Sequence, residues 1–431
     1  MAVLLLIGAA AQALGQGIDR ELARAYFAEA ETLGEAGSEL WGAPLYGPLL
    51  FVDRGTREVV ANIADPRGAL APADGVHVGT WPDSLAIYNG AVAFAGRTWT
   101  MLAWPLPEGR YERRRLLGHE LFHRLQVELG IPAPNPGNAH LDGEAGRAWL
   151  RLEWRALQDA LARAGDARRE AVRDALLFRA RRHELFPAGA SDERALELNE
   201  GLAEYTGVRV AIPGNARPGW VVRQLDDHDA RAARTSIVRS FAYASGPAYG
   251  VLLDGASGTW RHTIFEVGDL GRALAQAYRI QAMGAGSGDL PRRRALLYGG
   301  ERLFAEEAER EARRAAQQAR FRERFVTGPT LILPASEDVS YSFDPNAVAP
   351  FDEGGTVYLT TTVRDEWGTL TVTAGGALIV SEAGRVARIV VPAPADEASR
   401  PLRGEGWELV LAEGWEVRPL GEGDVTVLLV R

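Results

Sequence analysis

The sequence predicts an α+β fold that ends in a separate all-β domain. Short strand-like apolar runs occur between residues 48 and 104, helical periodicity dominates residues 113 to 325, and strand-like runs return after Gly328. At 431 residues the chain is too long for one ordinary domain. Because 46% of its residues are apolar, we expect two or three packed cores.

The N-terminal part predicts a helix followed by a small sheet. The pattern is helical from Ile18 to about Gly34. The strand-like runs that follow cover residues 48–53, 58–63, 76–80 and 97–104. Pro105 and Pro107 then end the last strand, because proline lacks the N–H that a strand needs.

The next segment, from Arg113 to Leu129, predicts a helix. Its leucines recur every four residues, at Leu117, Leu121 and Leu125. Gly130 and Pro132 follow as stop signals. We expect this helix to lie beneath the edge strand of the sheet.

Helical patterns fill most of the following two hundred residues. Ser191 is expected to cap a helix that runs to about Thr206. Between residues 301 and 325, oppositely charged pairs at i,i+4 spacing predict an exposed connecting helix. The predicted division is therefore an N-terminal sheet subdomain that includes the helix 113–129 (18–130), a helical subdomain (131–327) and a β domain (328–431).

The first 17 residues are similar to the apolar part of a secretory signal peptide, with Ala11 and Ala13 placed for cleavage. No Lys or Arg stands at the front of this run, as such signals usually have. The segment favours a secreted or periplasmic protein, with a cytoplasmic one as the alternative. No integral membrane span is expected, because no segment reaches the roughly 20 apolar residues that cross a bilayer.

The composition excludes several classes of partner and site. The net charge of −9 comes from 48 basic and 57 acidic residues mixed along the chain, so no basic stripe is available for nucleic acid. The absence of cysteine excludes disulfides, Cys-ligated zinc and thiol catalysis. Any metal must therefore be held by His, Asp or Glu. The sequence does not indicate an oligomeric state.

The predicted helix 113–129 contains the pattern His119-Glu120-Leu121-Phe122-His123. A separation of four residues brings His119 and His123 to one helical face, roughly 5 to 6 Å apart at Cβ, so that both can bind one Zn²⁺ ion. Glu120 projects one position round the helix. Its carboxylate can therefore reach a water on the metal and act as the general base.

Zinc needs a third protein ligand, and a second predicted helix offers two acids. Glu200 and Glu204 share a helical face with Leu196 and Ala203, so we expect both carboxylates to point inward. Unpaired acids would be costly there unless a cation were present. These residues are the first candidates to complete the metal site.

The two segments, residues 118–123 (Gly-His-Glu-Leu-Phe-His) and 199–205 (Asn-Glu-Gly-Leu-Ala-Glu-Tyr), resemble the gluzincin metallopeptidases, which include thermolysin-like proteases and zinc aminopeptidases. The resemblance implies a zincin-like catalytic domain with Glu200 as the third ligand. It also implies that Glu204 orients one of the zinc-binding histidines. The likeness covers little more than two helices, and the sequence departs from it at Arg124 and in the 76-residue gap before Glu200.

A second pair of acids is an alternative for the third ligand. Asp142 and Glu144 lie near the spacing that zincins with a shorter spacer use. We prefer Glu200 because its local motif is fuller. The metzincin pattern is excluded, since no Gly and His follow His123 at the required positions.

A hydrolytic zinc site usually also has a donor for the oxyanion that forms when water attacks a carbonyl. Tyr243 and Tyr249 lie in a segment that reads as a helix entering a bend rich in small residues. Either hydroxyl is a candidate for this role.

These observations predict a zinc-dependent metallopeptidase that hydrolyses peptide or protein substrates by a metal-activated water, with Glu120 as general base. The cleft should lie between the sheet and helical subdomains. The alternative is a non-catalytic zinc-binding scaffold or receptor whose β domain does the recognition. Glu120 favours the enzyme, because a scaffold has no need of a general base.

Overall fold

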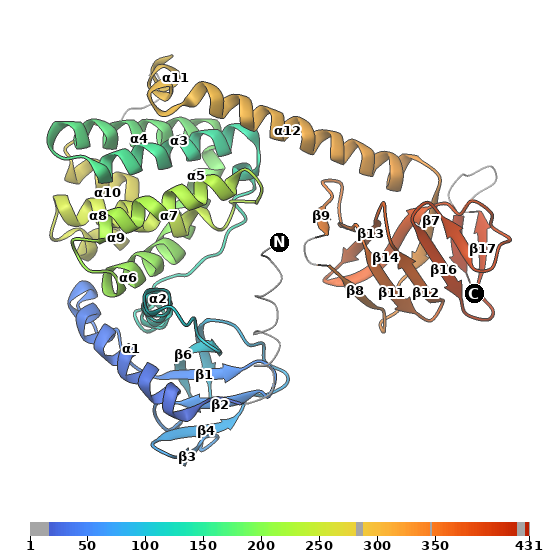
Figure 1. The fold of residues 1–431 in the computed structure, drawn as a ribbon, viewed down its shortest axis with the longest axis horizontal. Coiled ribbons are helices and arrows are strands. Elements are labelled where there is room, and N and C mark those ends of the chain that lie inside the picture. Colours follow the sequence, from blue (N-terminus) through green and yellow to red (C-terminus); the bar gives the residue numbers. More distant parts are fainter. Residues whose placement is uncertain (1–16, 282–287, 345–346, 420–426, 431) are drawn as a thin grey trace, which may run out of the picture. The chain divides into compact units, whose positions relative to one another are not determined.

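The computed structural model describes residues 17–281, 288–344, 347–419 and 427–430, and it has a mixed α+β fold (Figure 1). The chain divides into two compact units, Met1–Ala308 and Glu309–Arg431. The predicted signal segment 1–17 falls outside the described residues except for Gly17. The division lies within helix α12 (Gly300–Arg322), upstream of the predicted boundary at residue 328.

The first unit begins with α1 (Arg20–Trp41) and a six-stranded sheet. The strands are β1 (Leu49–Asp53), β2 (Glu58–Ala61), β3 (Ala71–Ala73), β4 (Val76–Thr80), β5 (Gly90–Phe94) and β6 (Arg97–Trp104). Their order is β3-β4-β2-β1-β6-β5, and β1 and β6 are a parallel pair in an otherwise antiparallel sheet. The four predicted strands correspond to β1, β2, β4 and β6, whereas β3 and β5 were missed because short runs rich in Ala and Gly have little strand signal.

Helix α1 is longer than predicted. It continues past Gly34 to Trp41 and ends at Gly42, which adopts the left-handed conformation with φ 67°. Gly34 lies inside the helix. It allows the helix to pack closely against Tyr46, because a side chain at Gly34 would collide with that residue. The glycine that ends the helix is therefore the one whose backbone requires it.

Helix α2 (Arg110–Glu128) follows the sheet and includes the predicted active-site segment. It contacts β5 and β6 on one side and α1 and α6 (Leu202–Ala211) on others, so it lies between the sheet and the helical region (Figure 1). The preceding strand, β6, is not the edge of the sheet, because β5 pairs outside it. The expected edge strand next to the helix is therefore β5.

Helices make up the rest of the first unit. They are η1 (Ala139–Asp142), α3 (Glu144–Ala162), α4 (Gly165–Leu185), α5 (Pro187–Leu196), η2 (Glu197–Gly201), α6, α7 (Arg217–Ala232), α8 (Phe241–Ala256), α9 (Trp260–Val267), α10 (Leu270–Ala277), α11 (Leu290–Ala295), η3 (Leu296–Tyr298) and the start of α12. The predicted cap at Ser191 is wrong. Helix α5 begins at Pro187, whose fixed φ suits a first helical turn, and the Ser191 hydroxyl donates to the carbonyl of Ala188 within the helix.

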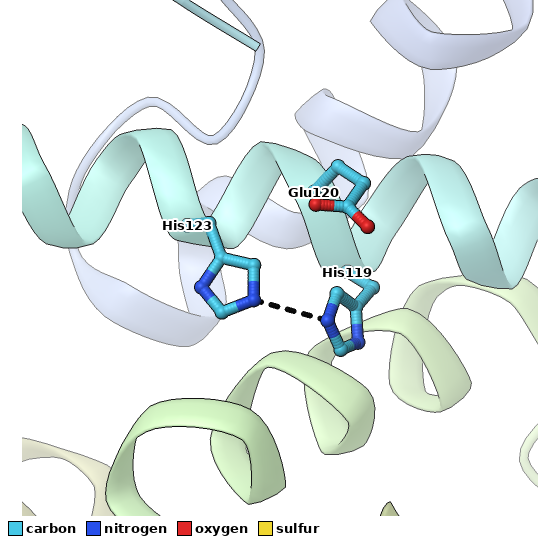
Figure 2. A group of neighbouring side chains, drawn as sticks. All are labelled: His119, Glu120 and His123. Carbon is cyan, nitrogen blue, oxygen red and sulfur yellow. Dashed lines mark hydrogen bonds between the residues drawn. The ribbon is translucent and has the colours of Figure 1, made fainter. Parts of the chain in front are cut away.

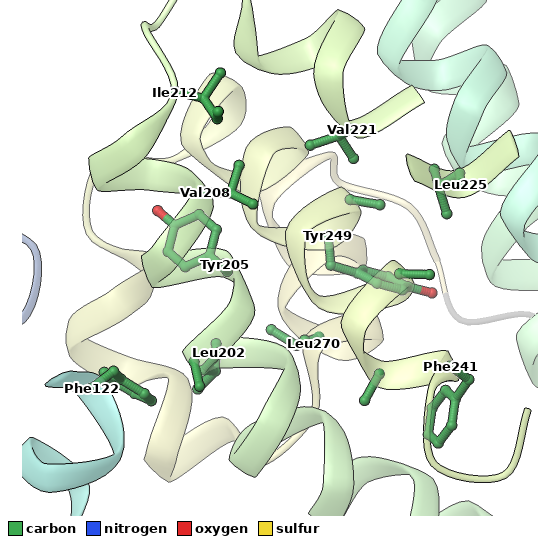
Figure 3. Packing of buried hydrophobic residues seen from close by; sticks show 14 of the residues in the cluster. Phe122, Leu202, Tyr205, Val208, Ile212, Val221, Leu225, Phe241, Tyr249 and Leu270 are labelled. Atoms are coloured by element: carbon green, nitrogen blue, oxygen red, sulfur yellow. The ribbon is translucent and has the colours of Figure 1, made fainter. Parts of the chain in front are cut away.

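One hydrophobic core joins the parts that the sequence placed in separate subdomains. It extends from Ile18 through α2 to Leu303. Figure 3 shows part of this core, to which Phe122 of α2 and Leu202 and Tyr205 of α6 contribute. The sheet and the helices are thus built around a common interior, and α2 contributes to it directly.

The second unit contains the end of α12, η4 (Glu323–Thr327) and two sheets. The seven-stranded sheet has the order β17-β18-β7-β14-β13-β10-β9 and the five-stranded sheet β15-β16-β12-β11-β8. Their strands are β7 (Thr330–Pro334), β8 (Ser340–Phe343), β9 (Val348–Pro350), β10 (Thr356–Tyr358), β11 (Thr361–Asp365), β12 (Gly368–Val372), β13 (Ala377–Glu382), β14 (Arg385–Pro392), β15 (Leu402–Gly404), β16 (Trp407–Leu411), β17 (Glu416–Pro419) and β18 (Val427–Val430). One core contains residues from both sheets, such as Leu331, Val363 and Leu409.

The long charged helix α12 is not solely a solvated connector. Its Glu307 is buried and pairs with Arg147 and Arg151 of α3. Phe321, near its other end, packs with Val357 and Leu378 of the second unit. In the described part of the chain, no helix combines the length and apolar character that crossing a bilayer requires.

Candidate metal centre

The histidine motif lies in the middle of α2. Figure 2 shows His119, Glu120 and His123 gathered on this helix. Among the described residues these three form a group that could hold a metal ion, since one ligand atom from each lies within 4.8 Å of the others. His119 Nε2 and His123 Nε2 are 3.0 Å apart. The spacing of four residues therefore brings the two ring nitrogens together, as the sequence predicts.

Glu200, which lies in η2, approaches the Nε2 atoms of both histidines. Its Oε2 lies 3.4 Å from His119 Nε2 and 3.4 Å from His123 Nε2. Tetrahedral ligands at zinc distances of about 2.0–2.1 Å are separated from each other by about 3.3–3.4 Å. The two separations to Glu200 match this spacing, and the 3.0 Å between the histidine nitrogens is somewhat shorter, so the three atoms approximate three corners of a tetrahedral site with a fourth position left open.

Two outer residues fix the proton positions on the histidine rings. Glu204 Oε2 lies 2.9 Å from His119 Nδ1, and its other oxygen accepts from Arg115 at 2.5 Å. Gln126 Oε1 lies 2.8 Å from His123 Nδ1. A carboxylate or amide oxygen can only accept, so each Nδ1 carries the proton that it donates. In the neutral rings the lone pairs are therefore on the two Nε2 atoms, which face Glu200.

The electrostatics of the site favour a positive charge at this point. Burial opposes the charged form of His119, but hydrogen bonds with Glu200 and Glu204 raise the pKa of His119 to about 10. Burial alone would raise the pKa of Glu200, yet its hydrogen bonds with the two histidines and Tyr243 lower it. Two lone pairs and a carboxylate oxygen at these separations repel one another, and a proton or a metal ion among them would relieve that repulsion.

Glu120 is buried but incompletely bonded. The residue is 5% exposed, and within the described structure its Oε2 has no hydrogen-bond partner. Burial raises the pKa of Glu120, while the neighbouring His119 and His123 oppose that shift. A buried carboxylate with a free oxygen and a raised pKa suits a group that accepts and returns a proton.

The two candidate tyrosines lie in different surroundings. The Tyr243 hydroxyl donates to Glu200 Oε2 at 2.7 Å, and its ring stacks on His119 with centroids 5.5 Å apart. The Tyr249 hydroxyl donates to Glu153 at 2.7 Å in a fully buried position. Tyr243 is thus at the candidate site, whereas Tyr249 belongs to a buried ionic cluster and is not placed to meet a substrate.

The alternative third ligands lie elsewhere. Asp142 accepts from the Ser236 hydroxyl at 2.9 Å and pairs with Arg147 at 3.5 Å. Glu144 is exposed at the start of α3. The described structure thus brings Glu200 to the two histidines, and it gives Asp142 different partners.

Glycine pairs allow the helices to approach closely enough for these contacts. Gly118 of α2 lies against Gly207 of α6, where a Cβ on Gly118 would be 3.0 Å from the Gly207 Cα. Gly201 of η2 faces Gly246 of α8, and a Cβ on Gly246 would collide with the Gly201 backbone. Close packing at both points holds Glu200 between α2 and α8.

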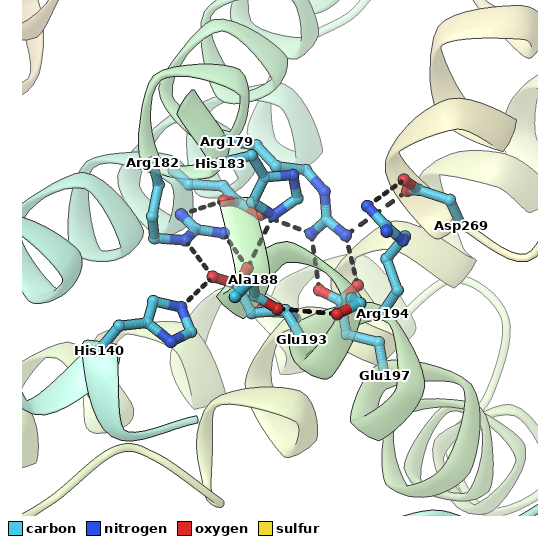
Figure 4. Close-up of polar contacts among 12 residues, drawn as sticks. His140, Arg179, Arg182, His183, Ala188, Glu193, Arg194, Glu197 and Asp269 are labelled. Carbon is cyan, nitrogen blue, oxygen red and sulfur yellow. Dashed lines mark hydrogen bonds and ion pairs between the residues drawn. The ribbon is translucent and has the colours of Figure 1, made fainter. Parts of the chain in front are cut away.

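Glu200 lies in a π-helical turn, η2. Another residue of this turn, Glu197, belongs to a buried ionic cluster (Figure 4). Glu197, at the start of this turn, accepts two hydrogen bonds from Arg179 at 2.7 and 2.6 Å. Arg182 pairs in the same cluster with Glu193 at 2.7 Å and Glu153 at 2.6 Å. Single π-helical turns are frequent at functional sites, and this one presents Glu200 toward the histidines.

Two residues of the site were missed in the sequence. Arg115 pairs with Glu204, and Gln126 contacts His123. Both lie on α2 at helical spacing from a histidine, Arg115 four residues before His119 and Gln126 three residues after His123. Their spacing of three or four residues from a histidine was the signal that could have found them, because residues at this spacing are neighbours on a helix surface.

Comparison with family models, curated proteins and solved structures finds no match to this chain.

Proposed function

We propose that the protein is a zinc metallopeptidase with His119, His123 and Glu200 as the metal ligands. The observation that carries this proposal is the convergence of two histidine nitrogens and one carboxylate oxygen with separations of 3.0, 3.4 and 3.4 Å. Because each histidine Nδ1 donates to Glu204 or Gln126, the lone pairs of both Nε2 atoms are directed to that point. Nitrogen and oxygen ligands in this number and spacing suit zinc.

Zinc at this position would activate water and polarise a carbonyl oxygen. The protein residues supply the remaining functions. Glu120 accepts the proton of the attacking water on its free oxygen and passes it to the leaving amine. The Tyr243 hydroxyl, which donates to Glu200 Oε2 at 2.7 Å, would exchange this acceptor for the oxyanion of the substrate.

The edge strand next to α2 supports a peptide as the substrate. Among the described strands β5 pairs only with β6, and it contacts α2. An extended peptide can add to such an edge through its main-chain groups, which is a common form of peptide recognition. Binding in this way would bring a peptide chain close to α2.

The proposal is tested with the variant Glu120→Gln. We expect the parent protein and the variant to hold about one zinc per chain. The variant should lose hydrolysis by about 100-fold or more, because a general base contributes on that order. Glu112→Gln is the matched control, since Glu112 is exposed on the first turn of the same helix.

The chain contains no lysine, which simplifies the assay. The substrate is a library of N-acetylated, lysine-free peptides. An amine-reactive dye then detects each newly formed α-amino group, and the background is one α-amino group per protein chain. Unchanged activity in Glu120→Gln would overturn the assignment of Glu120 as the general base and with it the proposed mechanism at this site. A zinc-loaded protein that leaves the whole library uncut would favour the scaffold or receptor function.

A further inference from the structure

Gln126 is a buried polar residue next to the metal centre, and it has two partners. It is 1% exposed on the last part of α2. Its Oε1 lies 2.8 Å from His123 Nδ1, and its Nε2 donates to the backbone carbonyl of Leu198 at 3.3 Å. Leu198 belongs to η2, the turn that also carries Glu200. One side chain therefore contacts two of the segments that supply metal ligands.

The partners determine the orientation of the Gln126 amide. The carbonyl of Leu198 can only accept, so the NH₂ group of Gln126 must face it. The amide oxygen then faces His123 and requires a proton on Nδ1. As a result, the lone pair of the neutral His123 ring is on Nε2, 3.4 Å from Glu200 Oε2. An amide satisfies both contacts, whereas a carboxylate would place an oxygen against the Leu198 carbonyl.

The two histidines are held by groups of different charge. Glu204, which orients His119, is a carboxylate paired with Arg115. Gln126 orients His123 without adding charge. The centre already contains the carboxylates of Glu120, Glu200 and Glu204, and a further buried carboxylate would have no cation of its own. A neutral amide avoids that cost.

We propose that Gln126 is a positioning residue that fixes the His123 ring and the Glu200 turn relative to each other. The inference rests on the proposed zinc site, because its consequence is tighter metal binding. Residues that orient metal ligands typically contribute about 10- to 100-fold in metal affinity. Gln126 does so for a histidine on its own helix and for an acid that comes from a distant part of the chain.

The test measures metal binding and needs no substrate. The full-length protein and the variants Gln126→Leu and Gln126→Glu are titrated with Zn²⁺ and Co²⁺ against a chromophoric chelator, and the visible spectrum of the Co²⁺ form is recorded. Leu125→Ala is the matched control, because Leu125 is a buried neighbour on α2 that packs in the core. It should lower stability but leave the metal affinity and the spectrum of the folded protein unchanged.

We expect zinc binding to weaken by about 10- to 100-fold in Gln126→Leu, with a changed Co²⁺ spectrum. Gln126→Glu should also bind more weakly than the parent, since it loses the donor to Leu198. Parent-like affinity in either variant would overturn the role of Gln126. A parent protein that binds no zinc would instead overturn the proposed function, so the two failures are distinguishable.

Discussion

Replacing Gly207 with alanine tests whether the close approach of α6 to α2 assembles the site. An ideal Cβ on Gly207 would lie under 3.0 Å from the carbonyl oxygen of Arg115 and 3.2 Å from the amide nitrogen of His119. Ordinary van der Waals contact begins at 3.4 Å. Both obstacles are backbone atoms, so α6 must move away from α2 by roughly 0.5 to 1 Å.

A displacement of this size is small for the fold and large for the site. Alanine favours a helix over glycine by about 1 kcal/mol, which offsets part of the about 1–3 kcal/mol that overpacking costs. The protein should therefore remain folded. The Glu204 contact to His119, now 2.9 Å, would lengthen toward or beyond the limit of a hydrogen bond. We expect zinc affinity to fall about 10- to 100-fold and peptidase activity about 100-fold.

The assay is chelator competition for zinc together with circular dichroism, which verifies that the helices persist. Gly219→Ala is the matched control, because Gly219 is an exposed position in α7 where a Cβ would meet only Arg223, at 3.8 Å. The control should bind zinc like the parent. If Gly207→Ala also binds zinc as tightly as the control, the close helix contact is not what assembles the metal centre.

Two further predictions concern the surroundings of the site. Glu204→Ala should weaken zinc binding by about 10- to 100-fold, because the His119 ring loses its hydrogen-bond acceptor. The control Glu112→Ala, on the exposed face of α2, should not weaken it. Equal zinc affinities of the two variants in chelator competition would contradict a role for Glu204. Arg182→Met should lower the free energy of unfolding by about 3–5 kcal/mol, because Glu153 and Glu193 lose a buried cationic partner. Denaturant unfolding of this variant is compared with that of Arg181→Met, a partly exposed neighbour, and equal midpoints would contradict the prediction.

The amino-acid sequence by itself determined the features that depend on local spacing. Four residues of separation placed His119 and His123 on one face of a helix, and the same spacing paired Glu200 with Glu204. The α+β character, four strands of the first sheet and the strand-rich C-terminal region were also predicted from periodicity. Such features follow from the backbone geometry of helices and strands, which is the same in any fold.

The meeting of distant segments was decided by the tertiary structure alone. The local motif favoured Glu200 over Asp142, but only the packed helices place Glu200 beside the histidines, and nothing local distinguishes Tyr243 from Tyr249 as the hydroxyl beside Glu200. Those choices depend on which helix faces pack together, and here packing depends on the close glycine contacts and on the π-helical turn. Periodicity assigns a residue to a face, but only the packed interior determines which faces meet.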